Sequence, residues 1–411
     1  MRSRSKLKMK CHIRICLIGL LLFAFSNNGV CQSFDKSDIS IFGQNWYGFA
    51  LNNNPYRISN GYMTYDVAVG FQTESSDSCV FAQAYGYPLI EAGISVAGLS
   101  NLVMDQNSFL PDLYAVYGGF ERTLIRREKF SFGFMLNLGI TTNVIRYDPI
   151  NNPGNTFLSS PVMAYFGGGF FAKRHLGKRW EIGADFMYRH YSNGKLSLPN
   201  GGMDVLGGGV FARYRLRDYD AGDYVRKPVK QVFRKGMIYH IAFSGGVHSC
   251  DSEWKVYNAM VEDPAQKQTK FSKHPKFSLS ADAMYRYALK YATGISLDMY
   301  YSSNMKELEK CDRILYGDAA VENCPGYDPI SVGVAVVQEL YWRNIAGYIA
   351  LGAYPYRHKG ISGYQGWHYE KAGLRYYFPG FSDTFLGFAI KAHNFVAEYF
   401  EFTIGVRLSK K

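Results

Sequence analysis

The stretch WEIGADFMYRHYS, residues 180–192, alternates strictly between two kinds of side chain. Every second residue from Trp180 is apolar until the row ends in His190 and Ser192, whereas the residues between them include Glu181, Asp185 and Arg189. An alternation of period two is the pattern of a β-strand whose two faces meet different surroundings. Because one row is apolar and the other carries charge, the stretch is typical of a membrane β-barrel with its apolar face toward lipid.

A second alternating run follows after a turn. Its outer row starts at Asp204 and continues through Leu206, Gly208, Val210, Ala212, Tyr214 and Leu216. If the two runs form a regular hairpin, His190 stands opposite Asp204, and directly opposed side chains on one face lie about 4.5–5.5 Å apart at Cβ. A base, a nucleophile and an acid would then share the lipid-facing side.

These three residue types are those of a serine hydrolase. Serine becomes a good nucleophile when an imidazole removes its proton, and a carboxylate fixes the tautomer of that imidazole and stabilises its charged form. His190, Ser192 and Asp204 are therefore the predicted catalytic residues. Asn200 or Asn193 could offer side-chain N–H groups to an oxyanion, and the glycines of the turn could offer backbone N–H groups.

Sixteen segments have the length and pattern of membrane strands, so the predicted fold class is an all-β, antiparallel transmembrane β-barrel of the outer membrane. The segments are 39–51, 61–73, 81–99, 112–124, 130–146, 161–174, 180–192, 202–217, 237–249, 276–287, 290–301, 331–342, 345–357, 366–378, 383–393 and 397–408. Aromatic residues make up 16% of the chain and charged residues 19%, and glycine occurs 42 times, as suits a β-rich membrane protein.

The connections between the strands alternate in length. Long segments such as 193–201, 250–275 and 302–330 alternate with short ones such as 125–129, 175–179 and 343–344. Long loops of outer-membrane barrels are extracellular and short turns periplasmic, so the hairpin of His190 and Asp204 should lie at the outer leaflet.

One connection breaks this alternation and divides the chain. Residues 218–236 form a long, charged linker where a short turn is expected, between a first half, 39–217, and a second strand-rich half, 237–409. Either the two halves close separately or they form one large barrel, and the rarity of tandem membrane barrels favours one barrel.

The N-terminal residues predict export. Six basic residues precede an apolar run, Ile15–Phe25, that is too short to span a bilayer, so residues 1–31 read as a signal peptide cleaved after Cys31. A lipoprotein anchor at Cys31 is the alternative. The chain has 46 Lys and Arg against 34 Asp and Glu, and removal of the signal leaves a net charge of +6. This mild charge suits an anionic membrane surface such as lipopolysaccharide better than nucleic acid.

Four cysteines follow the predicted signal: Cys79, Cys250, Cys311 and Cys324. An exported protein could pair them, and Cys311 with Cys324, within one loop, is the first expectation. Free thiols are the alternative, because spacing alone does not fix connectivity.

The turn region carries a family resemblance. His190-x-Ser192-Asn193, then Leu196, Pro199-Asn200-x-Gly202 and an acid at position 204 resemble the motif of the outer-membrane lipid A 3-O-deacylases, the PagL family. The motif is specific over about fifteen residues, and 147–153 is similar to larger relatives; the second half lies outside the resemblance.

The resemblance implies an eight-stranded barrel over roughly 39–217 and an esterase that acts on lipid A with a lipid-facing triad and no cofactor or metal. By it His190 is the base, Ser192 the nucleophile and Asp204 the orienting acid. Asp204 departs from the family, which more often has the longer Glu.

Two other functions remain open. The spacing of His190, Ser192 and residue 204 also resembles outer-membrane phospholipase A, which uses Asn as its third residue and calcium at its site. A porin or structural barrel is the non-enzymatic alternative.

Two further patterns are weaker. The glycine triplets at 167–169 and 207–209 read as places where strands pack closely. His393-Asn394 with Glu398 and Glu401 could form a second or metal site, but the spacing of metal ligands is missing.

Overall fold

The computed structural model describes residues 38–51, 61–73, 80–102, 108–142, 145–224, 234–363, 366–379 and 383–409. The predicted signal peptide with Cys31, the cysteine Cys79, and residues 225–233 of the linker lie outside the described residues.

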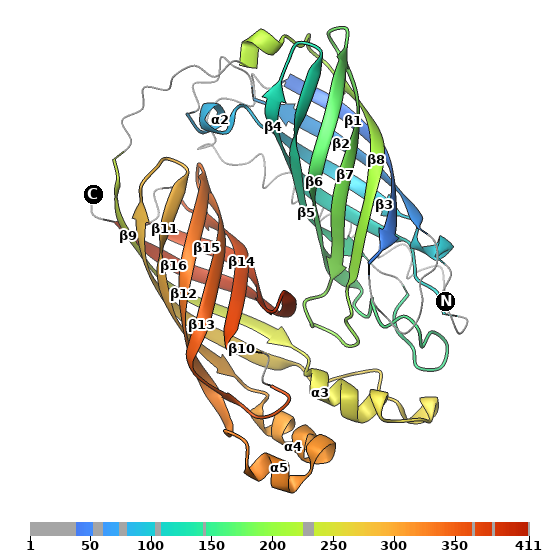
Figure 1. The fold of residues 1–411 in the computed structure, drawn as a ribbon, viewed down its shortest axis with the longest axis vertical. Coiled ribbons are helices and arrows are strands. Elements are labelled where there is room, and N and C mark those ends of the chain that lie inside the picture. Colours follow the sequence, from blue (N-terminus) through green and yellow to red (C-terminus); the bar gives the residue numbers. More distant parts are fainter. Residues whose placement is uncertain are drawn as a thin grey trace, which may run out of the picture.

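The chain folds into two closed antiparallel barrels of eight strands each, and within each barrel consecutive strands pair with one another (Figure 1). Strands β1 and β8 close the first barrel, with Ser40 opposite Arg215, and β9 and β16 close the second, with Gly246 opposite Glu401. The predicted fold class is confirmed, but the preference for one large barrel is wrong. Strand patterns of the two arrangements are alike, and only the long-range pairing of the first and last strands distinguishes them.

The strands of the first barrel are β1 (Asp38–Ala50), β2 (Tyr62–Gln72), β3 (Leu89–Ala97), β4 (Leu113–Arg126), β5 (Phe130–Thr142), β6 (Val162–Leu176), β7 (Trp180–Ser192) and β8 (Met203–Arg215). Those of the second are β9 (Gly236–His248), β10 (His274–Arg286), β11 (Tyr291–Ser302), β12 (Tyr327–Trp342), β13 (Ile345–Lys359), β14 (His368–Tyr377), β15 (Thr384–His393) and β16 (Val396–Ser409).

Strand β7 shows how each wall is built. Its apolar row faces outward, with Phe186 56% exposed, whereas Glu181 and Arg189 of the other row are buried in the barrel interior. A closed sheet leaves no unpaired backbone edge, and its exterior exposes apolar side chains, so the barrel is suited to lipid.

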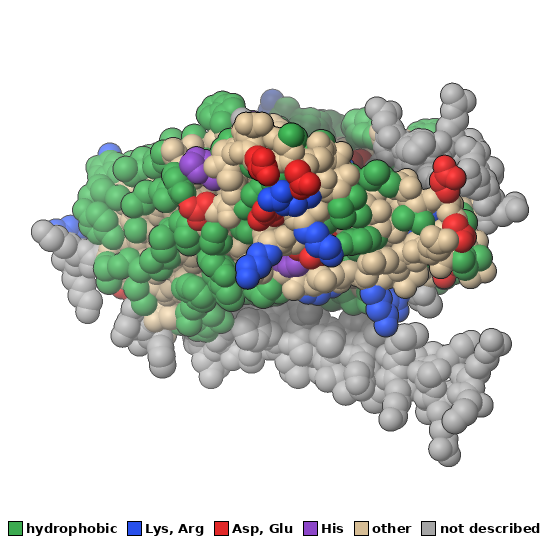
Figure 2. Space-filling model, turned by 90° about the horizontal axis from the view of Figure 1, so that it is seen from below, with side chains coloured by type: hydrophobic (Ala, Val, Ile, Leu, Met, Phe, Trp, Pro, Cys, Tyr) green, Lys and Arg blue, Asp and Glu red, His purple; other side chains and the backbone are tan. Residues whose placement is uncertain are grey.

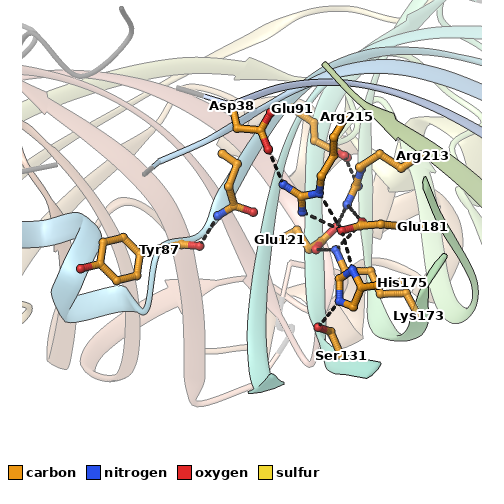
Figure 3. Close-up of polar contacts among 11 residues, drawn as sticks. Asp38, Tyr87, Glu91, Glu121, Ser131, Lys173, His175, Glu181, Arg213 and Arg215 are labelled. Carbon is orange, nitrogen blue, oxygen red and sulfur yellow. Dashed lines mark hydrogen bonds and ion pairs between the residues drawn. The ribbon is translucent and has the colours of Figure 1, made fainter. Parts of the chain in front are cut away.

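The interior of the first barrel holds a network of ion pairs (Figure 3) beside a cluster of buried aromatic side chains that includes Trp46 and Tyr62. Arg213 pairs with Glu91 at 2.5 Å and Glu121 at 2.8 Å, and Arg215 pairs with Glu181 at 2.7 Å. Buried charges are costly unless they are paired, so acids and bases from β3, β4, β7 and β8 compensate one another across the lumen.

The second barrel has the same kind of interior. Arg375 lies 3.0 Å from Asp282 and 2.6 Å from Glu339, and Lys371 lies 3.2 Å from Glu401. Glu401, one of the residues considered for a second site, therefore belongs to this internal network.

The glycine triplets stand where strands pack closely, as predicted. A Cβ at Gly169 would lie 2.1 Å from the backbone oxygen of Phe186, and one at Gly207 would lie 2.1 Å from that of Tyr47.

One predicted strand, 81–99, is wrong in its first part. Val80–Tyr85 forms the short helix α2, and only Leu89–Ala97 is strand. The helix lies at the end of the barrel with the short turns and packs on the second barrel, where the Tyr85 ring lies 5.2 Å from that of Trp342. The Tyr85 hydroxyl donates to the backbone oxygen of Tyr341 at 2.9 Å.

The opposite end carries further helices between strands of the second barrel: α3 (Asp251–Trp254), α4 (Met305–Tyr316) and α5 (Asp318–Glu322). One-turn helices complete the described connections: η2 (Leu99–Asn101), η3 (Ala221–Tyr224), η4 (Lys255–Ala259) and η5 (Pro264–Gln266). Seen from this end, charged side chains gather in the middle of the face and hydrophobic ones spread along one flank (Figure 2). No helix in the described ranges is both long and apolar enough to cross a bilayer.

The predicted disulfide between Cys311 and Cys324 is wrong. Both cysteines are free, as is Cys250. The Cys311 thiol, on α4, lies 3.9 Å from Glu307 Oε1, and burial raises its pKa to about 12. Cys324 follows α5 and accepts a hydrogen bond from the backbone N–H of Gly326 instead.

Candidate active site

His190 and Asp204 stand directly opposite each other on neighbouring strands β7 and β8, as the hairpin register predicted. His190 Nδ1 lies 2.5 Å from Asp204 Oδ1, and the side chains are 31% and 37% exposed on the outer face of the barrel. The shorter aspartate therefore reaches the imidazole. Its contact with Nδ1 leaves Nε2 as the ring nitrogen that can accept a proton.

Ser192 is the last residue of β7 and belongs to the same outer row, but it is only 3% exposed. The turn that follows folds back over it. Ser192 Oγ accepts hydrogen bonds from the Gly194 backbone N–H and from Asn200 Nδ2, each at 3.1 Å. Two donors thus converge on the candidate nucleophile from the turn.

Gly202 lies close to both His190 and Ser192. A Cβ at this position would lie 3.3 Å from His190 Cε1 and 3.7 Å from Ser192 Cβ, and its φ of +66° favours glycine. Among the described residues no hydrogen bond joins Ser192 Oγ to His190.

The two asparagines have different positions. Asn200 points its amide nitrogen at Ser192, and its Oδ1 accepts from the Asn193 backbone N–H at 3.2 Å. The side chain of Asn193 instead donates to Ser159 Oγ at 3.1 Å and to the Ser197 oxygen at 3.0 Å. Of the two predicted side-chain donors, only Asn200 contacts the serine, and Asn193 holds the turn in place.

Tyr188 was not predicted as a site residue. Its hydroxyl donates to Asp204 Oδ1 and lies 3.4 Å from His190 Nδ1. The period-two row that contains His190 also contains Tyr188, and a search for hydroxyl groups along that row could have found it.

The loop that precedes β6 supports the turn. Its Thr156 oxygen accepts from the Gly201 backbone N–H at 2.9 Å, and Ser159 accepts from Asn193 as described. Asp148 shapes this loop by accepting from the backbone N–H groups of Ile150 and Asn151, which hold the pKa of its carboxyl below the usual range.

The second barrel also contacts the turn. The Ser249 backbone N–H donates to the Lys195 oxygen at 2.8 Å, and Lys195 Nζ lies 2.6 Å from Asp251 Oδ2. The Phe400 ring of β16 packs against Gly194, where an added Cβ would lie 2.5 Å from the ring. The residue that offers one of the two donors to Ser192 is thus held between the barrels.

In the weaker candidate site near the C-terminus, His393 and Glu398 bind other side chains. His393 Nε2 lies 2.9 Å from the Tyr354 hydroxyl, and Glu398 is shared by lysines inside the second barrel. Within the described parts of the chain, no group of three or more His, Cys, Asp or Glu side chains is arranged to hold a metal ion.

Comparison with protein families gives a match in the second barrel. Residues 237–410 match the family model described as "Acyloxyacyl hydrolase, C-terminal domain". This match confirms the resemblance to the PagL-type family that the first barrel predicted. It also corrects the limits of that resemblance, which was expected to end near residue 220. The second half has no counterpart of the turn motif at 190–204, and for that reason the resemblance was not expected to extend into it.

No curated protein matches the chain. Among solved structures it is similar to the outer-membrane protein OpdK of Pseudomonas aeruginosa, with 10% identity, a TM-score of 0.20, and coverage of 92% of this chain and 100% of that one. It is also similar to the β domain of the Bordetella autotransporter BrkA, with 9% identity, a TM-score of 0.25, and coverage of 91% and 100%. Such low scores carry no argument about function.

The closed barrels, their apolar exterior and the family match identify an outer-membrane protein. The match also supports an acyl hydrolase as its broad class.

Proposed function

We propose that the protein is an outer-membrane esterase that removes a 3-O-linked acyl chain from lipid A, with Ser192 as nucleophile, His190 as base and Asp204 as orienting acid. One observation carries the proposal: the His190–Asp204 pair lies on the outer face of the barrel, beside a serine whose Oγ contacts two hydrogen-bond donors. Polar side chains on a lipid-facing surface are costly, so such a cluster points to function.

The first step would form an acyl-enzyme. Ser192 Oγ attacks the ester carbonyl carbon while its proton passes to His190 Nε2, and Asp204 stabilises the resulting imidazolium. The oxyanion forms on the former carbonyl oxygen, which is bonded to the carbon that Oγ attacks. The two groups that contact Oγ, the Gly194 N–H and Asn200 Nδ2, would donate to it. The proton then passes from His190 to the sugar oxygen as the C–O bond breaks.

Water completes the cycle. His190 takes a proton from the attacking water, the second tetrahedral intermediate uses the same two donors, and Ser192 leaves with the proton as the fatty acid departs. No step requires a metal ion, because imidazole and carboxylate supply the acid–base chemistry.

The site's position fits a lipid substrate. Ser192 stands opposite Ala164 of β6 and His190 opposite Phe166, so apolar side chains adjoin the polar cluster along the wall. An acyl chain could lie against this wall while its ester reaches Ser192, without leaving the membrane.

The decisive test is acyl release by purified protein in detergent with EDTA, measured by mass spectrometry of lipid A. Wild-type protein should release a 3-hydroxy fatty acid, and Ser192→Ala should lower the rate by about 10³-fold or more. Ser244→Ala is the matched control, because Ser244 faces the interior of the second barrel, where its Oγ lies 2.8 Å from Thr403 Oγ1. This control should keep wild-type turnover.

Two results would favour the alternatives. Calcium-dependent release of fatty acid from phospholipids, with lipid A untouched, would establish a phospholipase. Absence of hydrolysis of either lipid by protein shown to be folded, through its heat-dependent gel mobility, would leave a non-catalytic barrel.

A further inference from the structure

A small cavity lies at the mouth of the second barrel, at the end with helices α3–α5. Its volume is about 40 Å³, room for roughly three waters, which suits a phosphate-sized group and excludes a sugar ring. Six of the charged or titratable side chains that line it are Lys195, His248, Lys276, Arg357, Lys359 and Glu398. Lys195 lies in the turn between β7 and β8 of the first barrel, so residues of both barrels line the cavity.

Two of these cations have no acidic partner. Lys359 Nζ donates only to backbone oxygens, those of Asp328 at 2.8 Å and Pro329 at 2.9 Å. Arg357 donates to the backbone oxygens of Gly366 at 3.2 Å and Gly363 at 3.0 Å. Neither forms an ion pair with any residue that the structure describes.

The acids at the cavity are already engaged. Glu398 pairs with both Lys276 and Lys391, and Asp251 pairs with Lys195 at 2.6 Å. The carboxylate of Asp328 bonds to the Tyr356 hydroxyl and to a backbone N–H at the surface. Cations therefore outnumber acids around the cavity.

Two of the cations that line the cavity are also buried. Lys276 is 5% exposed and Lys359 7% exposed. Excess charge of one sign in a desolvated site is destabilising, and a bound anion would offset it.

A histidine adds a neutral donor or acceptor. His248, the last residue of β9, is 7% exposed, and its Nε2 has no hydrogen-bond partner among the described residues. A buried polar atom of this kind calls for a partner, and an oxygen of an anion in the cavity would supply one.

We propose that this cavity binds a phosphate group, with Lys276, Arg357 and Lys359 as its cationic ligands and His248 as a hydrogen-bond partner. Guanidinium and ammonium groups are the side chains that recognise phosphate oxygens. A bound phosphate would also attract Lys195, and so hold the turn that carries Gly194.

The source of the phosphate decides the consequence. Lipid A carries phosphate on the same disaccharide as its 3-O-acyl chains, so a phosphate in the cavity would anchor the substrate beside Ser192. This second step rests on the proposed function, whereas phosphate binding does not. Free inorganic phosphate has the same chemistry and would bind without serving as an anchor.

The first experiment measures binding of inorganic phosphate to the full-length protein in detergent, by ³¹P NMR and by the shift in Tm. Wild-type protein should bind phosphate and gain thermal stability, because a ligand that binds only the folded state stabilises it. Lys359→Met should weaken binding at least tenfold. Lys310→Met is the matched control, because Lys310 is 61% exposed on α4, and it should bind as wild type does.

The second experiment compares hydrolysis of bisphosphorylated and enzymatically dephosphorylated lipid A. The KM of wild-type protein should be at least tenfold lower for the phosphorylated substrate, and Lys359→Met should lose this preference while keeping kcat. His248→Gln provides the same test should Lys359→Met fail to fold.

The outcomes separate the two proposals. Failure of folded wild-type protein to bind phosphate would overturn the site. Phosphate binding with equal KM for both substrates would support the site and overturn the anchoring step. Phosphate binding without hydrolysis of any lipid would support the site and count against the proposed function alone.

Discussion

Each barrel has a histidine directly opposite an aspartate on a neighbouring strand, but on opposite faces of the wall. His190 faces Asp204 across β7 and β8 on the outside, and His240 faces Asp282 across β9 and β10 on the inside. The Nδ1–carboxylate distances are 2.5 Å and 3.2 Å, and the side chains of the inner pair are at most 2% exposed. The same two residue types thus meet lipid in one barrel and a packed interior in the other.

The surroundings decide what each pair can do. His240 Nε2 lies 3.2 Å from the Tyr377 hydroxyl, and Arg375 contacts both His240 and Asp282. Both nitrogens of the inner imidazole are engaged, whereas the carboxylate of the outer pair contacts only Nδ1 of His190. A histidine–acid pair is therefore a candidate for catalysis only where one ring nitrogen can reach a substrate.

Removing each acid in turn should give the largest contrast. Asp204→Ala should lower lipid A hydrolysis by about 10³–10⁴-fold with little change in stability, because an orienting carboxylate is lost from an exposed site. Asp282→Ala should keep turnover within twofold but destabilise the barrel by about 3 kcal/mol, because Arg375 and His240 lose a buried partner. The measurements are initial rates of acyl release and urea unfolding in micelles.

Equal losses of activity in the two variants, with both proteins folded, would break the distinction between the faces. Such a result would mean that the Asp204 carboxylate contributes to catalysis no more than the internal Asp282 carboxylate does.

Substitution of Asn200, the side-chain donor of the turn, should have the next largest effect on activity. Asn200→Ala removes one of the two donors to Ser192 and should lower kcat about 10²–10³-fold. Asn200→Asp should be at least as damaging, since a carboxylate repels an oxyanion. Asn323→Ala, on the surface beyond α5, is the control and should leave kcat unchanged. Wild-type kcat in Asn200→Ala would remove this residue from the oxyanion site.

The smallest effect should come from Tyr188. Tyr188→Phe removes a hydroxyl that donates to Asp204, and a single such bond contributes about 1 kcal/mol, so kcat should fall less than tenfold with KM unchanged. Tyr341→Phe is the matched variant in the second barrel, where the hydroxyl donates to Glu339. Its turnover should equal that of wild type. A change in KM instead of kcat would assign Tyr188 to substrate binding.

Much of this arrangement follows from period-two patterns. The register of His190 with Asp204 and the outward direction of Ser192 depend only on alternation along β7 and β8 and on the length of the turn. Helix α2 was missed because apolar residues at every position of Val80–Tyr85, apart from Gln83, hide the period. The separate closure of two barrels was missed because it depends on pairing between β1 and β8, strands far apart in the sequence.

The roles of the two asparagines show a different limit. Asn193 and Asn200 are chemically identical, and their directions are set by Ser159 and by the backbone of the turn. Contacts between loops determine which amide reaches Ser192, and no local pattern records them.

The ion pairs inside both barrels bear on the permeability of the cell envelope. Charged side chains extend across each lumen, where a porin would hold a water column. The first barrel has the pair Arg213–Glu181 and the second has the pair Arg375–Glu339. We expect these charged side chains to impede the ions and small antibiotics that cross through porins. A cell could carry many copies of this protein and keep its resistance to such solutes, and planar bilayers containing it should show no steady conductance.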